Sequence, residues 1–376
     1  MTRRTPVNLI LALLIGAAGC QESSSTPDSS MVQTPGTSVP ADTGAPIPGS
    51  GTPTPLADAS APPSAPDAGA RDAGTTVDSG LISDAAISSA GDAAINDGGS
   101  QADGSVVSPV ATCLPTANLM PGESTKTLQM GSMARKYLLH VPTGYTGKTP
   151  VPLVIDWHGL LLDGPAQRDL SGYAELADKE GFIVAFPTGL DQAWNVGPCC
   201  TTSRDVDDVA FARALVAEIE KLGCIDPKRV YSTGFSMGGG MTMNLACRAA
   251  DLFAAFAPAA FDLLIESEQA CQPSRPVSII TFRGRNDFIV PYAGGESMPP
   301  NGLNVTIHFR GAEGTFDFWK KANGCTGAAT MKVACETYAN CAAGTETALC
   351  RGDDLVGHIP GDAATGWAVL KRFTLP

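Results

Sequence analysis

The sequence predicts an α/β fold with a mostly parallel sheet and helices on both faces. Short apolar runs typical of buried strands alternate with segments of helical spacing, which is the pattern of strands joined by helical crossovers. A glycine-rich stretch at residues 234–240 directly follows one of these runs and opens a helical segment. Together these observations point to a sheet whose strand ends carry loops able to hold a site.

Six apolar runs predict strands. They cover residues 137–142, 152–159, 181–187, 229–235, 254–260 and 276–282. Between the third and the fourth, apolar residues from Phe211 to Leu222 recur at helical spacing, and Asp205 is the expected helix cap. Residues 237–250 predict a second helix, which begins directly after the fourth strand.

Composition divides the chain near residue 110. The formal net charge is −13, yet residues 21–110 hold 11 acidic groups against the single base Arg71, and residues 111–376 carry only −5. All 23 aromatic residues and ten of the 11 cysteines follow residue 110. We therefore predict that residues 21–110 form a disordered acidic linker and residues 111–376 a single domain. A nucleic-acid partner is not expected, because no basic patch occurs.

The first 20 residues have the pattern of an export signal. Two arginines precede an apolar run at residues 7–18 that is too short to span a bilayer. Residues 17–20 resemble the lipobox of bacterial lipoproteins, in which the cysteine carries the lipid. We therefore expect Cys20 to be lipidated and to anchor the protein at the outer membrane or cell surface, with no other membrane contact. The alternative is an ordinary secretory signal and release from the cell.

The candidate nucleophile is Ser236, in the G-x-S-x-G motif Gly234-Phe235-Ser236-Met237-Gly238. An apolar strand runs into the motif and a helix leaves it, which is the setting of a nucleophile elbow. Glycines are needed at both ends because side chains there would collide with neighbouring backbone. The helix directs N–H groups and the positive end of its dipole at a developing oxyanion. The alternative for Ser236 is an ordinary helix cap.

A nucleophilic serine needs a base, and the chain holds four histidines. Serine hydrolases of this fold place the triad in the order Ser, acid, His, so only His308 and His358 qualify. His358, on a Gly-flanked loop, is the predicted base, whereas His308 lies in an alternating segment typical of a packed or surface residue. Asp287, directly after strand 276–282, is the predicted acid that orients the imidazole. The other carboxylates weighed for this role are expected to be surface charges: Asp317, Asp353 and Asp354.

A second oxyanion donor is expected in the loop after strand 152–159. There the N–H of Leu160 follows the turn His158-Gly159, and it is paired with the N–H of Met237. His158 is expected to stabilise this loop rather than to act in catalysis, and it is also a candidate for contact with substrate.

Several segments together resemble one family. "DWHG", "VDDVAFARALV", "RVYSTGFSMGGGMT", "DFIVPYAGG" and a late "GH" are similar to secreted feruloyl esterases and polyhydroxybutyrate depolymerase-like carboxylesterases, a branch of the α/β hydrolases. The similarity covers about residues 111–376. It implies Ser236, Asp287 and His358 as the triad, and Leu160 and Met237 as oxyanion donors.

The same resemblance implies that Trp194 lines the acyl cleft, and the alternative is a buried core tryptophan. The chain departs from the family's pattern at two places. Arg283-Gly284 stands where the family usually has His-Gly, and "VGHIPG" lacks the tryptophan that the family places beside His358.

Ten cysteines in an exported domain are an even set, typical of a disulfide framework. A metal site is not expected, because no paired C-x-x-C occurs and Cys199 and Cys200 are adjacent. The residues alone leave the pairing open. Order and the family resemblance suggest that Cys247 pairs with Cys271, Cys325 with Cys341 and Cys335 with Cys350, and that Cys113 and Cys224 take Cys199 and Cys200 in either order.

The sequence thus predicts an exported serine esterase that uses no cofactor and acts on a polymeric or oligomeric ester. The resemblance suggests hydroxycinnamoyl esters of plant polysaccharide first, and poly(3-hydroxybutyrate) or its oligomers second. The remaining alternatives are a peptidase of the same fold and a non-catalytic surface-binding lipoprotein. The oligomeric state is left open.

Overall fold

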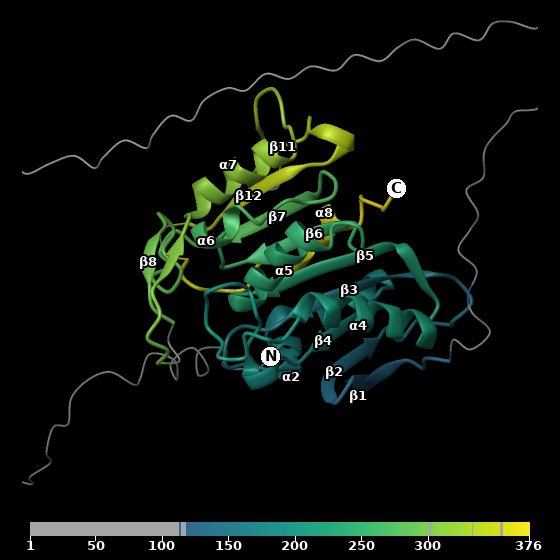
Figure 1. Ribbon diagram of the computed structural model, residues 1–376. Coiled ribbons are helices and arrows are strands. Elements are labelled where there is room, and N and C mark those ends of the chain that lie inside the picture. Colours follow the sequence, from purple (N-terminus) through teal and green to yellow (C-terminus); the bar gives the residue numbers. More distant parts are fainter. Residues whose placement is uncertain (1–112, 114–117, 300–301, 333, 354–355) are drawn as a thin grey trace, which may run out of the picture. The chain divides into compact units, whose positions relative to one another are not determined.

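The computed structural model describes residue 113 and residues 118–299, 302–332, 334–353 and 356–376 (Figure 1). The predicted signal segment with Cys20, the predicted linker and Asp354 lie outside the described residues. Within the described part of the chain, no helix is both long and apolar enough to cross a bilayer.

The main sheet has ten strands. Their bounds are β1 (Gly122–Met130), β2 (Met133–Val141), β3 (Val151–Trp157), β4 (Ile183–Pro187), β5 (Ile225–Phe235), β6 (Ala255–Ala259), β7 (Ser278–Arg283), β10 (Thr330–Lys332), β11 (Cys335–Tyr338) and β12 (Thr347–Arg351). They lie in the order β1-β2-β4-β3-β5-β6-β7-β12-β11-β10. The pairs from β4 to β12 are parallel, and antiparallel strands extend both edges.

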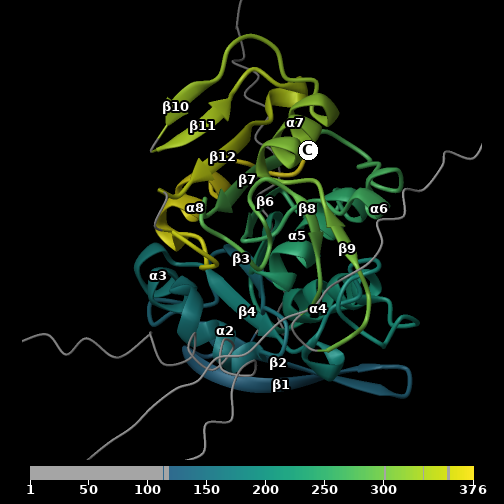
Figure 2. The same ribbon diagram turned by 90° about the vertical axis from the view of Figure 1, so that its left-hand side faces the viewer.

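Helices cover both faces of this sheet. They are α2 (Gly164–Ser171), α3 (Tyr173–Glu180), α4 (Asp208–Leu222), α5 (Met237–Arg248), α6 (Ile265–Glu268), α7 (Ala312–Ala322) and α8 (Ala363–Leu370). Figure 2 shows α3 and α8 on one side of the sheet and α4 and α6 on the other. A small antiparallel sheet of β8 (Gly295–Ser297) and β9 (Ile307–Phe309) stands beside the main one.

Successive side chains along a strand point to opposite faces of the sheet, so each face has its own hydrophobic core. In β3, Leu153, Ile155 and Trp157 join the cluster under α4 and α5, whereas Val154 joins the cluster under α3 and α8. Because both faces are covered, the central strands are apolar on both sides, which is why they appear in the sequence as continuous runs. The predicted α/β-hydrolase fold is confirmed.

The six predicted strands are present as β2 to β7, with bounds shifted by a few residues. The predicted cap of α4 was wrong by two positions. Asp207, not Asp205, is the N-cap, because its side chain accepts the N–H of Ala210 at 2.9 Å, while Asp205 lies in the preceding turn.

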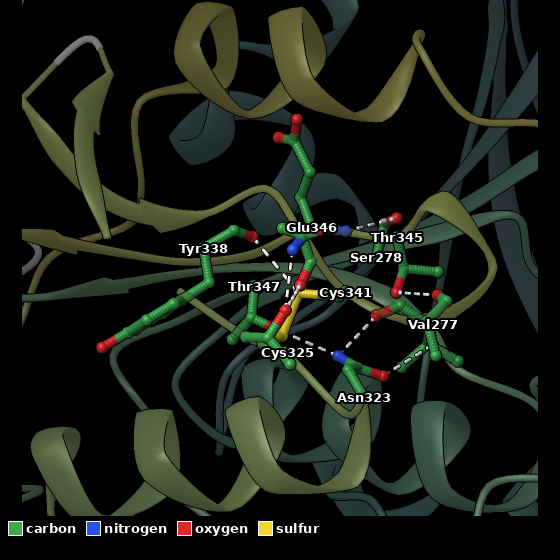
Figure 3. Close-up of a disulfide and its surroundings, with 12 residues drawn as sticks. Val277, Ser278, Asn323, Cys325, Tyr338, Cys341, Thr345, Glu346 and Thr347 are labelled. Atoms are coloured by element: carbon green, nitrogen blue, oxygen red, sulfur yellow. Dashed lines mark hydrogen bonds between the residues drawn. A yellow bond between two sulfur atoms is a disulfide. The ribbon is translucent and has the colours of Figure 1, made fainter. Parts of the chain in front are cut away.

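Five disulfides join the ten described cysteines. Three pairs are those that the resemblance suggested: Cys247–Cys271, Cys325–Cys341 and Cys335–Cys350. The expected cross-pairing of the other four was wrong, because Cys113 bonds Cys224 and Cys199 bonds its neighbour Cys200. Figure 3 shows Cys325–Cys341 beside Asn323, whose side-chain amide donates to Thr347 at the start of β12.

The two unexpected bonds differ in what they contribute to stability. Cys113–Cys224 spans 111 residues and ties the start of the domain to β5. By the chain-entropy relation such a loop stabilises the fold by about 5 kcal/mol, whereas a bond between adjacent residues contributes only about 1 kcal/mol. The Cys199–Cys200 bond therefore adds little to overall stability.

Candidate active site

Ser236 lies at the sharp joint between β5 and α5. Its backbone has φ 55° and ψ −123°, a conformation that side-chain-bearing residues rarely adopt. The joint is held from two sides, since the Ser236 N–H donates to the carbonyl of Ala259 at 2.9 Å and the Ser236 carbonyl accepts from the Gly240 N–H at 3.0 Å. This conformation places Ser236 at the end of β5, where it borders the cleft.

The glycines of the motif are required by close backbone approach. A Cβ atom on Gly238 would overlap the carbonyl oxygen of Trp157 in β3, and one on Gly234 would overlap the carbonyl oxygen of Gly238. The steric reason predicted for both glycines is confirmed.

The structure brings Ser236, His358 and Asp287 together, although 122 positions separate the first two in the sequence. His358 Nε2 lies 2.8 Å from Ser236 Oγ, and His358 Nδ1 lies 2.8 Å from Asp287 Oδ2. A carboxylate only accepts, so the Nδ1–H donates to Asp287 and Nε2 is left to accept the serine hydroxyl. This is the arrangement in which a serine can be deprotonated as it attacks.

Asp287 is fixed by the loop that follows β7. It is 4% exposed, and its Oδ1 accepts the N–H groups of Ile289 at 3.0 Å and Val290 at 2.9 Å. His358 follows β12, and its ring lies 5.0 Å from the ring of Phe235. The candidate nucleophile, acid and base thus follow the carboxyl ends of three parallel strands, β5, β7 and β12.

The other candidates for base and acid lie elsewhere. His308 in β9 pairs with Glu266 and Glu296 on the surface. Asp317 and Asp353 are exposed.

Leu160 and Met237, the predicted oxyanion donors, border the same cleft as Ser236. The hydrogen bonds within the described residues give no acceptor to the N–H of Leu160 or of Met237. Met237 opens α5, so its free N–H and the positive end of the helix dipole coincide. A Cβ atom on Gly159 would come within 3.2 Å of the Ser236 Cβ, which shows how closely the loop that carries Leu160 approaches the serine.

Trp194 and His158 do not contact the cleft, so their prediction as substrate-binding residues needs correction. Both are wholly buried. The Trp194 indole N–H donates to the His158 carbonyl at 2.8 Å, and His158 Nε2 accepts from Gly189 while Nδ1 donates to the Gly159 carbonyl. Burial lowers the pKa of His158 to about 4, which keeps the ring neutral and this bonding pattern intact. The pair supports the loop that carries Leu160, as expected for His158.

The cleft beside Ser236 has mainly apolar walls. The bordering residues include the two predicted oxyanion donors, the two cysteines of the adjacent disulfide, and Ile289 from the segment that begins at Asp287. They are Leu160, Met237, Cys199, Cys200, Phe261, Ile289, Ser297, Met298, Pro299, Ile307 and Phe309. Nothing in the sequence indicated that Phe261, Met298 or Phe309 would border the cleft. Within the described residues, no group of His, Cys, Asp and Glu could hold a metal ion.

A buried ion pair lies next to Asp287. Arg283 and Asp262 pair with each other, and neither side chain is exposed to solvent. Arg283 also donates to the carbonyl of Val290 at 2.6 Å and lies 3.9 Å from Asp287 Oδ2. The arginine that departs from the family's usual His-Gly thus bridges a buried carboxylate and the loop of the acid.

A model of the Dienelactone hydrolase family matches residues 195–312. A "Feruloyl esterase B" from Piromyces equi is 43% identical over 251 residues, which cover 64% of this chain and 46% of that protein. A "Feruloyl esterase C" from Emericella nidulans is 28% identical over 200 residues, which cover 51% of this chain and 68% of that protein. The solved acetyl xylan esterase from Aspergillus awamori is 18% identical with a TM-score of 0.47, and covers 66% of this chain and 99% of its own.

The resemblance to feruloyl esterases that the motifs indicated is confirmed by the two proteins of that name. The match nevertheless spans less than half of the length of the Piromyces equi protein.

Proposed function

We propose that the domain is a serine carboxylic ester hydrolase that cleaves hydroxycinnamoyl esters of plant polysaccharide through an acyl-enzyme. The observation that carries this proposal is the continuous chain from Ser236 Oγ through His358 to Asp287, with 2.8 Å at each link, at a strained elbow beside two free N–H groups. The similarity to proteins named feruloyl esterase supports the choice of ester.

In the proposed mechanism each of these groups has one step. Ser236 Oγ attacks the ester carbonyl carbon while His358 Nε2 takes the hydroxyl proton, and the carbonyl oxygen becomes an oxyanion held by the N–H groups of Met237 and Leu160. Protonated His358, stabilised by Asp287, gives its proton to the leaving alcohol oxygen. A water molecule then attacks the acyl carbon while His358 takes its proton, the bond to Ser236 Oγ breaks, and the carboxylic acid product leaves.

The walls of the cleft favour an apolar acyl group. Phe261, Ile289 and Met298 surround the space next to Ser236, and among the described residues no charged side chain borders it. An acyl group with an aromatic ring would bury more apolar surface there than an acetyl group and would be held correspondingly more strongly.

The test is activity of the full chain, produced in an oxidising host, on a ferulate ester, an acetylated xylan and a poly(3-hydroxybutyrate) film. We expect ferulate to be the best substrate. Ser236→Ala is the control, and it should lose several orders of magnitude in kcat because the triad acts as a unit. Activity that survives this substitution would refute the mechanism, and a protein inactive on all three would favour the binding-lipoprotein alternative.

A second candidate, hydrolysis of poly(3-hydroxybutyrate), is favoured by one feature. Large apolar side chains are exposed next to three of the site residues: Leu161 after Leu160, Phe288 after Asp287 and Ile359 after His358. Such a rim suits contact with an apolar solid. Activity on the film alone would reverse the ranking of the two substrates.

We also infer that the protein is exported, with its five disulfides as the support. Lipidation at Cys20 stays a prediction from the sequence. Cys20→Ser should move the protein from the membrane fraction to the soluble fraction. An unchanged distribution would leave the ordinary secretory signal as the better explanation.

A further inference from the structure

We propose that the Cys199–Cys200 disulfide is the wall of the acyl cleft that contacts the aromatic ring of the substrate, and that it sets the preference for an aromatic acyl group over acetyl. This inference rests on the proposed esterase function and deepens it by naming a specificity-determining element. Neither the triad nor the oxyanion donors include these two residues.

The position of the bond is the first argument. Both cysteines border the cleft that Ser236, Met237 and Phe261 also border. Cys199 is wholly buried and Cys200 is 6% exposed, so the pair forms part of an inner wall. An acyl group attached to Ser236 Oγ would therefore lie beside this pair of residues.

The loop that presents the bond is held at both ends, which makes the wall rigid. On one side, the Asn195 N–H donates to buried Asp208 at 2.7 Å, and Asp208 is itself paired with buried Arg135 at 2.7 Å. Beyond the pair, Ser203 Oγ donates to Asp191 at 2.5 Å, and the Thr201 N–H donates back to the Cys199 carbonyl at 3.0 Å. A wall fixed in this way loses little freedom when a ligand binds.

Stability does not account for the bond. A link between neighbours closes the shortest loop that a disulfide can close, and so constrains the unfolded chain least. Cys200 also has φ 73°, a conformation unfavourable for a residue with a side chain. Such a feature persists where it serves a site, and here it lies in the candidate site.

The chemistry of the pair suits an aromatic ring. Oxidised sulfur has no hydrogen to donate, is polarisable, and makes favourable contacts with aromatic rings at about 5 Å. An acetyl group on Ser236 is too short to gain from a surface of this kind. The contact would be present in the bound ester and in the transition state alike, so its loss is expected in KM more than in kcat.

The experiment compares p-nitrophenyl ferulate with p-nitrophenyl acetate, two esters with the same leaving group. The proteins are the wild-type full chain, the double variant Cys199→Ala/Cys200→Ala, and the matched control Cys325→Ala/Cys341→Ala. The control also removes one disulfide, and Cys325 and Cys341 lie beside Asn323 and Thr347 (Figure 3). Neither of these two cysteines borders the cleft at Ser236. Cys199→Ser/Cys200→Ser serves as a second variant of the pair.

We expect the ratio of kcat/KM for ferulate to kcat/KM for acetate to fall about threefold to tenfold in the Cys199/Cys200 variants, as the size of sulfur–aromatic contacts implies. The control should keep the wild-type ratio. An unchanged ratio in both Cys199/Cys200 variants, or equal loss of both activities, would overturn the inference, since equal loss means that the bond only holds the loop.

The wild-type measurement separates this inference from the proposed function. A wild type that prefers ferulate supports the function, and the variants then decide the role of the disulfide alone. A wild type active on neither ester refutes the proposed function itself. A wild type active on acetate without any preference for ferulate refutes the preference for an aromatic acyl group and, with it, the inference.

Discussion

Replacing Asp156 by Asn is expected to make the protein more stable relative to the wild type as pH rises from 5 to 8. Asp156 lies in β3, is 1% exposed and accepts from Gln167 Nε2 at 2.8 Å. Burial raises its pKa from 3.8 to about 7, and hydrogen bonds from Ser171 and Gln167 offset only part of that effect. The folded state therefore holds a proton that the unfolded chain has already released.

The sign and size of the effect follow from proton linkage. Because the pKa of Asp156 is higher in the folded state, its contribution to stability is fully present below about pH 4 and is lost as pH rises towards 7. The full loss is about 4 kcal/mol, and about 3 kcal/mol of it falls between pH 5 and pH 8. Asn does not titrate, so the variant avoids this loss.

The assay is urea unfolding of the wild type and Asp156→Asn at pH 5 and pH 8. Asp156 Oδ2 has no hydrogen-bond partner within the described residues, so the Asn side-chain amide placed there would be unsatisfied. This costs about 1–3 kcal/mol at every pH and therefore cancels when the two pH values are compared. The difference in unfolding free energy between variant and wild type should therefore rise by about 3 kcal/mol from pH 5 to pH 8, a shift of about 1 M in the urea midpoint. A difference that does not change with pH would refute the reasoning.

Three further substitutions test the site. Gly238→Ala should give a protein that does not fold to an active form, because the new Cβ overlaps the Trp157 carbonyl, and near-wild-type activity would contradict the elbow geometry. Arg283→Met should cost about 3–5 kcal/mol in thermal or urea unfolding by leaving Asp262 buried and unpaired, and the added change Asp262→Leu should restore most of it. Trp194→Phe removes one hydrogen bond to the loop of the oxyanion donor, so kcat should fall about tenfold at unchanged KM; a change in KM alone would instead indicate substrate contact.

Local signals in the sequence were strong enough to predict six strands of the main sheet and the helix after Ser236. Continuous apolar runs mark strands covered on both faces, and the glycines around Ser236 mark a place where backbone segments approach closely. These features depend on a few neighbouring residues, so their physical cause is present in the sequence itself. Strands β1, β10, β11 and β12 of the main sheet were not predicted, and β1, β10 and β11 at its edges have mixed surfaces and weaker patterns.

Only the tertiary structure decided which faces of the loop residues meet the cleft. Trp194 and His158 were predicted at the substrate but lie beneath it, because burial depends on how the loop after β4 packs against the loop after β3. The sequence likewise left the cysteine pairing open, because whether two sulfurs can bond depends on the distance between positions far apart in the chain. What the sequence determined was the chemistry present at the strand ends. How those groups face one another, and that Cys199 bonds Cys200 at the wall of the cleft, followed from long-range packing that no local pattern encodes.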